Sequence, residues 1–409
     1  MFVLERSGFS LQMLNCRIPQ SMYRFLFSVF FLIVSMGLSA CDVMETSPED
    51  SNLLIGVAIP QTGIGGVIGQ SVTSGIHLAI QELETLSNLN IALAFIDTRA
   101  TVMGTKDAYR QFIGMENLPV IIGPLTSTNT EAIIPVLNEN DIISLGPTSS
   151  KQGLSAQSEN LFRLSLTNDR IVPTGIRTSK ANLDFKNVAT LYNSGDAFSV
   201  ASNESIVGEL QAYNDITVVI QASYSAQEGT LLSEADVSSQ LDNILSTTPP
   251  VDAIFLSGLS PDHDVILPSA YRKGNSASFI IPLLSIASVH TINSREPGAA
   301  EGAVTFGIWL SSSPNSLSKA FVESYMDNFG TLPDDWATRG YAATSLLVEA
   351  FRQSPAYDYN SVRNSLAGIR DFPTILGSFS FDHHGDAVYD PVVAVVRNNE
   401  FSAWPAVSK

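Results

Sequence analysis

Short apolar runs alternate with amphipathic stretches along most of this chain. Leu53–Ile59 (LLIGVAI) ends at Pro60 and has the pattern of a buried strand. Residues 61–69 form a Gly-rich segment that predicts a loop, and a helix should follow, because apolar residues then recur at three- and four-residue spacing: Val72, Ile76, Ala79, Ile80 and Leu83. Further strands are predicted over 91–96, 120–122 and 142–145, with helices over 105–115 and from near Ser127. Four strand–helix units in succession predict a parallel sheet with helices on both faces.

The same alternation restarts at Asn187, so the chain should contain a second α/β lobe. Strands are predicted over 187–192, 216–220, 253–256 and 279–281, and the clearest helix has Val237, Leu241, Ile244 and Leu245 on one face. After Gly302, the spacing predicts amphipathic helices near 316–329 and 336–352, then strands near 378–381 and 392–396. No short internal repeat interrupts this order.

An export signal is indicated ahead of the first strand. From Met22, a short start carrying Arg24 leads into an apolar run over 25–34 and then small residues that end at Cys41. The run is short for a bilayer span, which favours a cleaved signal over a transmembrane helix. We therefore expect residues 1–40 to be a signal peptide, with translation starting at Met22, and residues 41–51 to be a polar tether.

The end of this signal, Leu38-Ser39-Ala40-Cys41, resembles the bacterial lipobox. That resemblance implies lipidation of Cys41, which would become the first residue of the mature chain and anchor it in a membrane through its acyl chains. The alternative is an ordinary secretory signal with a chance cysteine. Asp42 resembles an inner-membrane retention signal and points weakly to that membrane on the periplasmic side.

Charge and cysteine content narrow the functional classes. The formal net charge is −18, which argues against nucleic acid because phosphate binding needs a basic surface. The two cysteines are Cys16 and Cys41, so the mature body would hold neither a disulfide nor a zinc site with cysteine ligands.

Several segments, in this order and spacing, resemble the type I periplasmic solute-binding proteins of the leucine/isoleucine/valine-binding family. They are IGVAIPQTG (55–63), Gly69, Gly75, Asp97, VIIGPLTSTNTEA (120–132), IISLGPTSS (142–150), GAAEG (298–302) and SFSFDHHGDA (378–387). The resemblance implies two Rossmann-like α/β lobes joined by three crossings, with the ligand between them. The N-lobe would comprise 52–168 plus 307–385, and the C-lobe 169–306 plus 386–409.

A candidate site follows the third predicted strand. Gly123-Pro124-Leu125-Thr126-Ser127-Thr128 opens a helix, whose free N–H groups and dipole favour a carboxylate. The hydroxyls of Ser127 and Thr128 would add donors, and Gly123 would let the backbone approach the ligand; alternatively, either hydroxyl merely caps the helix. The resemblance places Ser127 where relatives grip the α-carboxylate, and Thr148 and Ser150 where they offer a carbonyl and a hydroxyl to the ligand.

Other positions depart from the amino-acid binders of that family. Phe198 stands where they have a tyrosine in the opposite lobe, Ile68 replaces an aromatic residue in the first loop, and Ser285 falls where an acidic residue pairs with the ligand's ammonium group. A buried ammonium without a charge partner is costly. Either Asp196 or Asp262 takes that role, or the ligand is not an α-amino acid.

Three other motifs are set aside. The glycines at 63–69 do not fit G-x-G-x-x-G, which would require glycine at position 68. Asp262-His263-Asp264 and Asp382-His383-His384 fall in predicted turns, so no metal is expected. Trp336 and Tyr341 are interpreted as core or cleft-rim aromatics.

No serine elbow or nucleophilic cysteine is present in the mature sequence, so we expect a binding protein without cofactor rather than an enzyme. The resemblance implies the lipid-anchored substrate-binding protein of an ABC importer, whose partners are a small polar solute (an amino acid or a related amide or carboxylate) and a membrane permease. The alternative is a non-transport envelope lipoprotein of the same fold that acts as a ligand sensor or protein activator.

Overall fold

The computed structural model describes residues 53–87, 89–226 and 229–404. These residues belong to one structural unit. The predicted signal peptide, lipidation site and tether lie outside the described residues.

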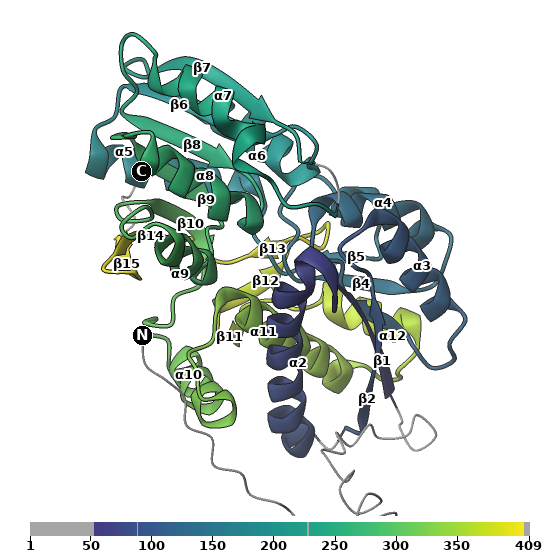
Figure 1. The fold of residues 1–409 in the computed structure, drawn as a ribbon. Helices are drawn as coiled ribbons and strands as arrows, with labels where there is room; N and C mark the ends of the chain where they lie inside the picture. The colour runs from purple at the N-terminus through teal and green to yellow at the C-terminus, as the bar shows by residue number, and fades with distance from the viewer. Residues whose placement is uncertain (1–52, 88, 227–228, 405–409) are drawn as a thin grey trace, which may run out of the picture. The chain divides into compact units, whose positions relative to one another are not determined.

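The first lobe, here called the N-lobe, is built on a five-stranded parallel sheet with strand order β2-β1-β3-β4-β5 (Figure 1). Its elements are β1 (Leu53–Ile59), η2 (Gly63–Gly65), α2 (Gly66–Ser87), β2 (Ile91–Asp97), α3 (Val102–Ile113), β3 (Val120–Ile122), α4 (Ser127–Asn138), β4 (Ile143–Gly146), η3 (Ser155–Gln157) and β5 (Leu161–Arg163). The predicted strands and the start of α4 are confirmed. Helix α3 begins three residues before its predicted start because the Thr101 side chain accepts a hydrogen bond from Gly104 N (3.0 Å) and caps it.

The glycine-rich segment after β1 is helical, so the loop predicted there is wrong. Residues Gly63–Gly65 form a 3₁₀ turn, and α2 begins at Gly66. Ile64 and Ile68 lie four residues apart, and both line the same cavity. Spacing of this kind places two side chains on one helical face, and their shared burial favours the helix over a free loop.

Alternation along β1 places side chains in cores on the two faces of the sheet. Ile55 and Val57 pack in the core that includes Val72 and Ile76 of α2, whereas Ala58 packs with the residues of α3 and α4. All of these side chains are fully buried. A parallel sheet covered on both faces needs this near-continuous apolar sequence.

The second lobe, the C-lobe, contains a seven-stranded sheet with the order β15-β14-β10-β9-β8-β6-β7. Its elements are α5 (Asn168–Leu183), β6 (Asn187–Asn193), α6 (Ala197–Leu210), β7 (Thr217–Tyr224), α7 (Glu234–Leu245), β8 (Ala253–Ser257), α8 (Ser260–Arg272), β9 (Ser278–Pro282), α9 (Ile286–Arg295), β10 (Val304–Ile308), β14 (Val392–Arg397) and β15 (Glu400–Trp404). Strands β6 to β10 pair in parallel, while β14 is antiparallel to β10 and β15 to β14.

Between β10 and β14 the chain completes the N-lobe. It forms α10 (Ser316–Phe329), α11 (Asp335–Gln353), α12 (Tyr359–Ala367) and a small antiparallel sheet of β11 (Phe372–Thr374), β12 (Gly377–Phe381) and β13 (Ala387–Val388). The chain therefore passes between the two large sheets three times: after β5, after β10 and before β14. This architecture confirms the predicted fold class of two α/β lobes with parallel sheets.

Helices α2 and α11 pack side by side along the N-lobe (Figure 1). Gly75 and Gly340 let their backbones approach closely: a Cβ atom added at Gly75 would lie 1.9 Å from the Ala337 carbonyl oxygen, and one at Gly340 would lie 2.1 Å from that of Val72. A side chain at either position would force the helices apart. The crossing therefore fixes the position of α11 against α2.

Across residues 53–404, as far as the structure describes them, none of the helices is both long and apolar enough to cross a bilayer.

Candidate ligand-binding site

A small cavity of about 110 Å³ is bounded by residues of both lobes, and we call it the cleft cavity. The N-lobe side chains and backbone that line it belong to Pro60, Ile64, Gly65, Ile68, Ala100, Leu125, Thr126, Ser127, Thr148 and Trp336. The C-lobe contributes Phe198, Gly258, Leu259, Ser260, Pro261 and Leu283.

The position of the cleft cavity follows from the direction of the strands. Pro60 comes directly after β1, Thr148 lies two residues after β4, Gly258 follows β8 and Leu283 follows β9. The carboxyl ends of parallel strands meet at one edge of a sheet, where α/β proteins bind their ligands. Here the cavity lies at the carboxyl edges of two sheets at once.

Of the residues predicted for the site, Ile68, Ser127, Thr148 and Phe198 line this cavity. Ser127 is the first residue of α4 and is almost fully buried. Its Oγ accepts hydrogen bonds from Lys151 N (3.1 Å) and from Ser149 Oγ (3.3 Å). The helix cap is the preceding residue, Thr126, whose side chain accepts from Asn129 N (3.2 Å). Ser127 is therefore not the cap of α4, and its hydroxyl does not serve that role.

The neighbouring loop presents Thr148 to the cavity. The Thr148 hydroxyl donates to the Leu125 carbonyl, which leaves its oxygen lone pairs open. Ser150 is fully buried and outside the cavity lining; among the described residues its Oγ has no hydrogen-bond partner. Its carbonyl accepts from Asn168 N (2.9 Å).

Gly123 has a structural role that the sequence did not indicate. Its φ is +134°, and an added Cβ would lie 2.3 Å from the Ala58 carbonyl oxygen. The glycine thus permits the close approach of β3 to β1, and it does not line the cleft cavity. The Gly123 carbonyl accepts from Tyr109 and Ser144, which fixes the turn into α4.

Thr128 and Asp196 join the two lobes beside the cavity. Thr128 Oγ1 donates to Asp196 Oδ1 (2.9 Å) and accepts from Ala197 N (3.0 Å). The other carboxylate oxygen of Asp196 accepts from the N and Oγ atoms of Ser199 (2.9 and 2.8 Å), so Asp196 also caps α6. Both oxygens of this carboxylate are thereby engaged.

Ser285 and Asp262 form their hydrogen bonds within the C-lobe. Ser285 caps α9 by accepting from Ser288 N (3.1 Å) and does not line the cavity. Asp262 accepts from Tyr224 Oη (2.8 Å) and Asn193 Nδ2 (3.3 Å) in a buried network. Burial raises the pKa of Asp262, and burial together with the Asp262 carboxylate raises the pKa of Tyr224.

Sequence reasoning missed most of the C-lobe wall, including Gly258, Leu259, Ser260 and Leu283. The available signal was their position immediately after the predicted strands over 253–256 and 279–281. Trp336, which had been interpreted as a core or rim aromatic, lines the cavity from the start of α11.

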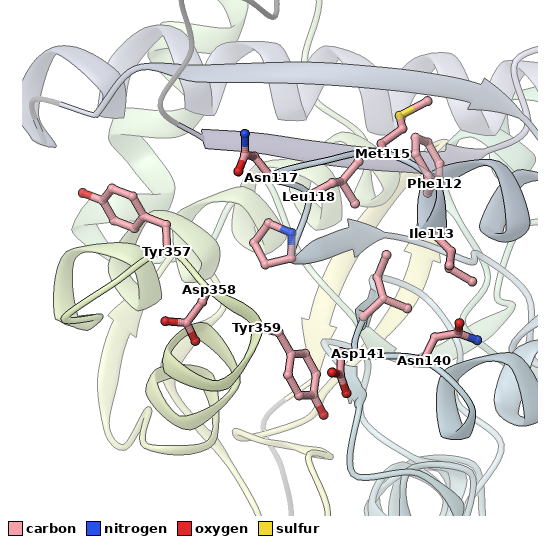
Figure 2. A pocket seen from close by; sticks show the side chains of 12 residues that line it. Phe112, Ile113, Met115, Asn117, Leu118, Asn140, Asp141, Tyr357, Asp358 and Tyr359 are labelled. Carbon is pink, nitrogen blue, oxygen red and sulfur yellow. The ribbon is translucent and has the colours of Figure 1, made fainter.

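Two larger cavities lie elsewhere in the N-lobe. One, of about 600 Å³, is lined by Tyr357, Asp358 and Tyr359 on one side and by residues that include Asn117 and Asp141 on the other (Figure 2). It lies at the amino ends of β3 and β4. A second, of about 520 Å³, lies between α2, α10 and α11. Neither is at the carboxyl ends of the strands of the two large sheets. The cleft cavity lies at those ends in both sheets, and it is therefore the candidate site.

No group of three or more histidine, cysteine or acidic residues is placed to hold a metal ion within the part of the chain that the structure describes. His263 lies in the first turn of α8 and is fully buried, and burial lowers its pKa from 6.5 to about 4. The adjacent Asp264 is affected in the opposite direction, because burial raises its pKa from 3.8 to about 6.

These two groups should make opposite contributions to the pH dependence of stability. Between pH 4 and 6, Asp264 binds more protons in the folded than in the unfolded protein, so its contribution to the free energy of unfolding falls as pH rises. His263 binds fewer protons in the folded than in the unfolded protein, so its contribution to the free energy of unfolding rises with pH up to pH 6.5. Asp264→Asn removes the contribution that falls with pH, so the urea midpoint of this variant should increase more steeply between pH 4 and 6 than that of the wild type. His263→Leu removes the contribution that rises with pH, so its urea midpoint should increase less steeply than that of the wild type. The same change of slope in both variants would contradict this.

Taken together, two α/β lobes with a cavity at the carboxyl edges of their sheets define a two-lobed solute-binding protein. Residues 53–400 match the model of the periplasmic binding protein family, and the chain belongs to that family. The family consists of binding proteins of the cell envelope, so the chain is a binding protein and not an enzyme.

Similar proteins agree with this assignment. The chain is 23% identical over 350 residues to Leu/Ile/Val-binding protein homolog 2 of Brucella abortus, covering 84% of this chain and 90% of that protein. It shares its fold with a leucine-binding protein of Thermotoga maritima (TM-score 0.76, 23% identity, covering 86% and 98% of the two chains). The fold is also that of an ABC transporter solute-binding protein of R. palustris in complex with benzoate (TM-score 0.75, 18% identity, 87% and 98%).

Proposed function

We propose that this chain is the lipid-anchored substrate-binding protein of an ABC importer and that it holds a small solute in the cleft cavity. The observation that carries the proposal is that residues of both lobes line one cavity, Ser127 and Thr148 on one side and Phe198 on the other. A ligand held between two lobes favours the arrangement in which they meet, because only that arrangement offers both sets of contacts. The permease would then recognise this arrangement.

A screen of amino acids, amides and small carboxylates tests the function directly. The purified full-length chain is unfolded and refolded to remove bound solute, and its thermal unfolding is followed with each compound. A ligand at one hundred times its dissociation constant adds about 2.7 kcal/mol to the stability. If no compound of a broad library shifts the transition, the protein is not a solute carrier, and a role in protein interaction becomes the better account.

Ser127→Ala should weaken binding of the solute found in that screen by about 1 kcal/mol or more, because it removes a buried hydroxyl that lines the cleft cavity. Calorimetric titration measures the change. Ser155→Ala is a control, since its buried hydroxyl accepts from Arg163 Nε (3.0 Å) and does not line the cavity. Wild-type affinity of Ser127→Ala would refute the assigned polar contact.

The lipid anchor of this proposal rests on Leu38-Ser39-Ala40-Cys41. Two or three acyl chains hold a protein on a membrane stably, whereas one does so only marginally. Cys41→Ser should therefore move the chain from the membrane fraction to the soluble fraction. If the variant remained with the membrane to the same extent as the wild type, another segment would have to anchor it.

A further inference from the structure

The charge character of the cleft cavity restricts the class of solute, given the proposed solute-binding function. None of the described residues that line it carries an ionisable side chain. The lining consists of aliphatic and aromatic groups, glycine backbone and hydroxyls. A charged group of the ligand must therefore be stabilised by backbone dipoles and hydroxyls alone.

Asp97, Asp196, Asp262 and Asp335 lie within three residues of lining residues in the sequence, and each is engaged by protein donors. Asp97 accepts from Gln61 N (2.8 Å) and Thr62 Oγ1 (2.5 Å). Asp335 accepts from Trp309 N (2.8 Å) and lies 3.5 Å from Arg339 Nε. Asp196 and Asp262 are held by the bonds described above. None of these carboxylates lines the cavity, so a ligand ammonium inside it would have no charge partner among the described lining residues, and burying an unpaired cation is expensive.

A negative group of the ligand would be stabilised, because helices α4 and α2 begin at this cavity with their positive ends. Ser127 is the first residue of α4, and Ile68 lies in the first turn of α2. Neither first turn contains an acidic residue. The partial positive charge at such ends stabilises an anion and repels a cation.

The Ser127 hydroxyl provides a second indication of an acceptor on the ligand. Both hydrogen bonds recorded at its oxygen are accepted from Lys151 and Ser149, so within the described structure its own hydrogen has no acceptor. The side chain is 1% exposed and lines the cavity. A carboxylate oxygen of the solute would accept the hydrogen bond that this buried hydroxyl can still donate.

The opposite wall is apolar. Phe198, Leu259 and Leu283 line it. The C-lobe helices α6 and α8 carry Asp196 and Asp262 at their starts, and these carboxylates offset the positive ends on that side. The cavity is thus favourable to an anion near α4 and to hydrocarbon against the C-lobe.

We propose that the solute is a small monocarboxylate with an apolar body and no amino group. Its carboxylate would lie at Ser127 and the start of α4, and its aliphatic or aromatic body would pack against Phe198 and Leu283. The lack of ionisable side chains in the described lining is then the basis of this specificity.

Matched pairs of compounds test this class on the full-length chain by calorimetric titration. The probes are 4-methylpentanoate against leucine, and 3-phenylpropanoate against phenylalanine, since each pair differs only by the α-amino group. We expect the acid of at least one pair to bind about tenfold or more tightly than its amino acid. Equal or tighter binding of the amino acids, or an amino acid as the best compound of the broad screen, would overturn the solute class and leave the solute-binding function intact. Failure of every solute would refute the function itself.

A second test places a charge in the cavity. Ser260 lines it at the first position of α8, where an acidic side chain suits the helix dipole. Ser260→Asp should weaken binding of the preferred acid by about tenfold or more, whereas the neutral Ser260→Asn, of nearly the same size, should change it by only about threefold or less. Equal affinities for the two variants, both folded by circular dichroism, would contradict the anionic assignment.

Discussion

Arg163→Met should lower the free energy of unfolding by about 3–5 kcal/mol, because it leaves a buried carboxylate without its counter-ion. Arg163 is fully buried at the end of β5. Its Nε donates to Asp386 Oδ1 (2.8 Å), and its Nη2 lies 2.6 Å from the same oxygen. Its Nη1 donates to the Lys151 carbonyl, so the same side chain braces the loop that carries Thr148. Methionine fills similar space but restores none of these bonds.

Urea unfolding followed by circular dichroism measures this loss. Arg110→Met is the matched control, since Arg110 pairs with Asp107 at 3.0 Å and both side chains are more than half exposed. Exposed pairs contribute about 0–1 kcal/mol. If the two variants were destabilised equally, the pair formed by Arg163 and Asp386 would not be a buried support of the fold.

Thr128→Val is the second substitution with a large expected effect, and it acts on the contact between the lobes. Valine cannot donate to Asp196 or accept from Ala197 N, and the contact loses both bonds. A hydrogen bond to a charged group is worth about 1.5–3 kcal/mol. We therefore expect the ratio of joined to separated lobes to fall by about tenfold or more, and solute affinity to fall with it.

Small-angle X-ray scattering of the ligand-free variant should show a larger radius of gyration, and titration a weaker affinity. Thr130→Val is the control, because this buried residue of the same helix donates to the carbonyl of the helix cap, Thr126 (2.8 Å), and not to the other lobe. If both variants behaved alike, loss of a helical side chain would explain the result. If Thr128→Val behaved like the wild type, the bond to Asp196 would not hold the lobes together.

Most of the regular structure could be predicted from the sequence because its signal is local. The buried strand Leu53–Ile59 and the helices α10 and α11 are long enough for apolar periodicity to be decisive. The short strands β5, β11 and β13, of two or three residues, give no such signal and form only where a neighbouring strand supplies hydrogen bonds.

The candidate site could be predicted only in part. Ser127 and Thr148 belong to segments that follow predicted strands, and a resemblance in those segments was enough to propose them. Asp196 and Asp262 were indistinguishable as partners of an ammonium group from sequence, because nothing local shows that Thr128 engages one and Tyr224 the other. These two hydrogen bonds join residues about 70 and 40 positions apart in the sequence.

The sequence by itself determined the alternation of strands and helices and the two lobes, since these follow from periodicity. The N-lobe side of the candidate site was proposed from a resemblance in the segments that follow predicted strands. Only the tertiary structure decided that Thr126 rather than Ser127 caps α4, that Gly123 serves the contact of β3 with β1, and that the lining holds no charge. The reason is physical: burial and hydrogen-bond partnership are properties of neighbours in space, and the residues that settle them here come from the other strand, the adjacent loop or the opposite lobe.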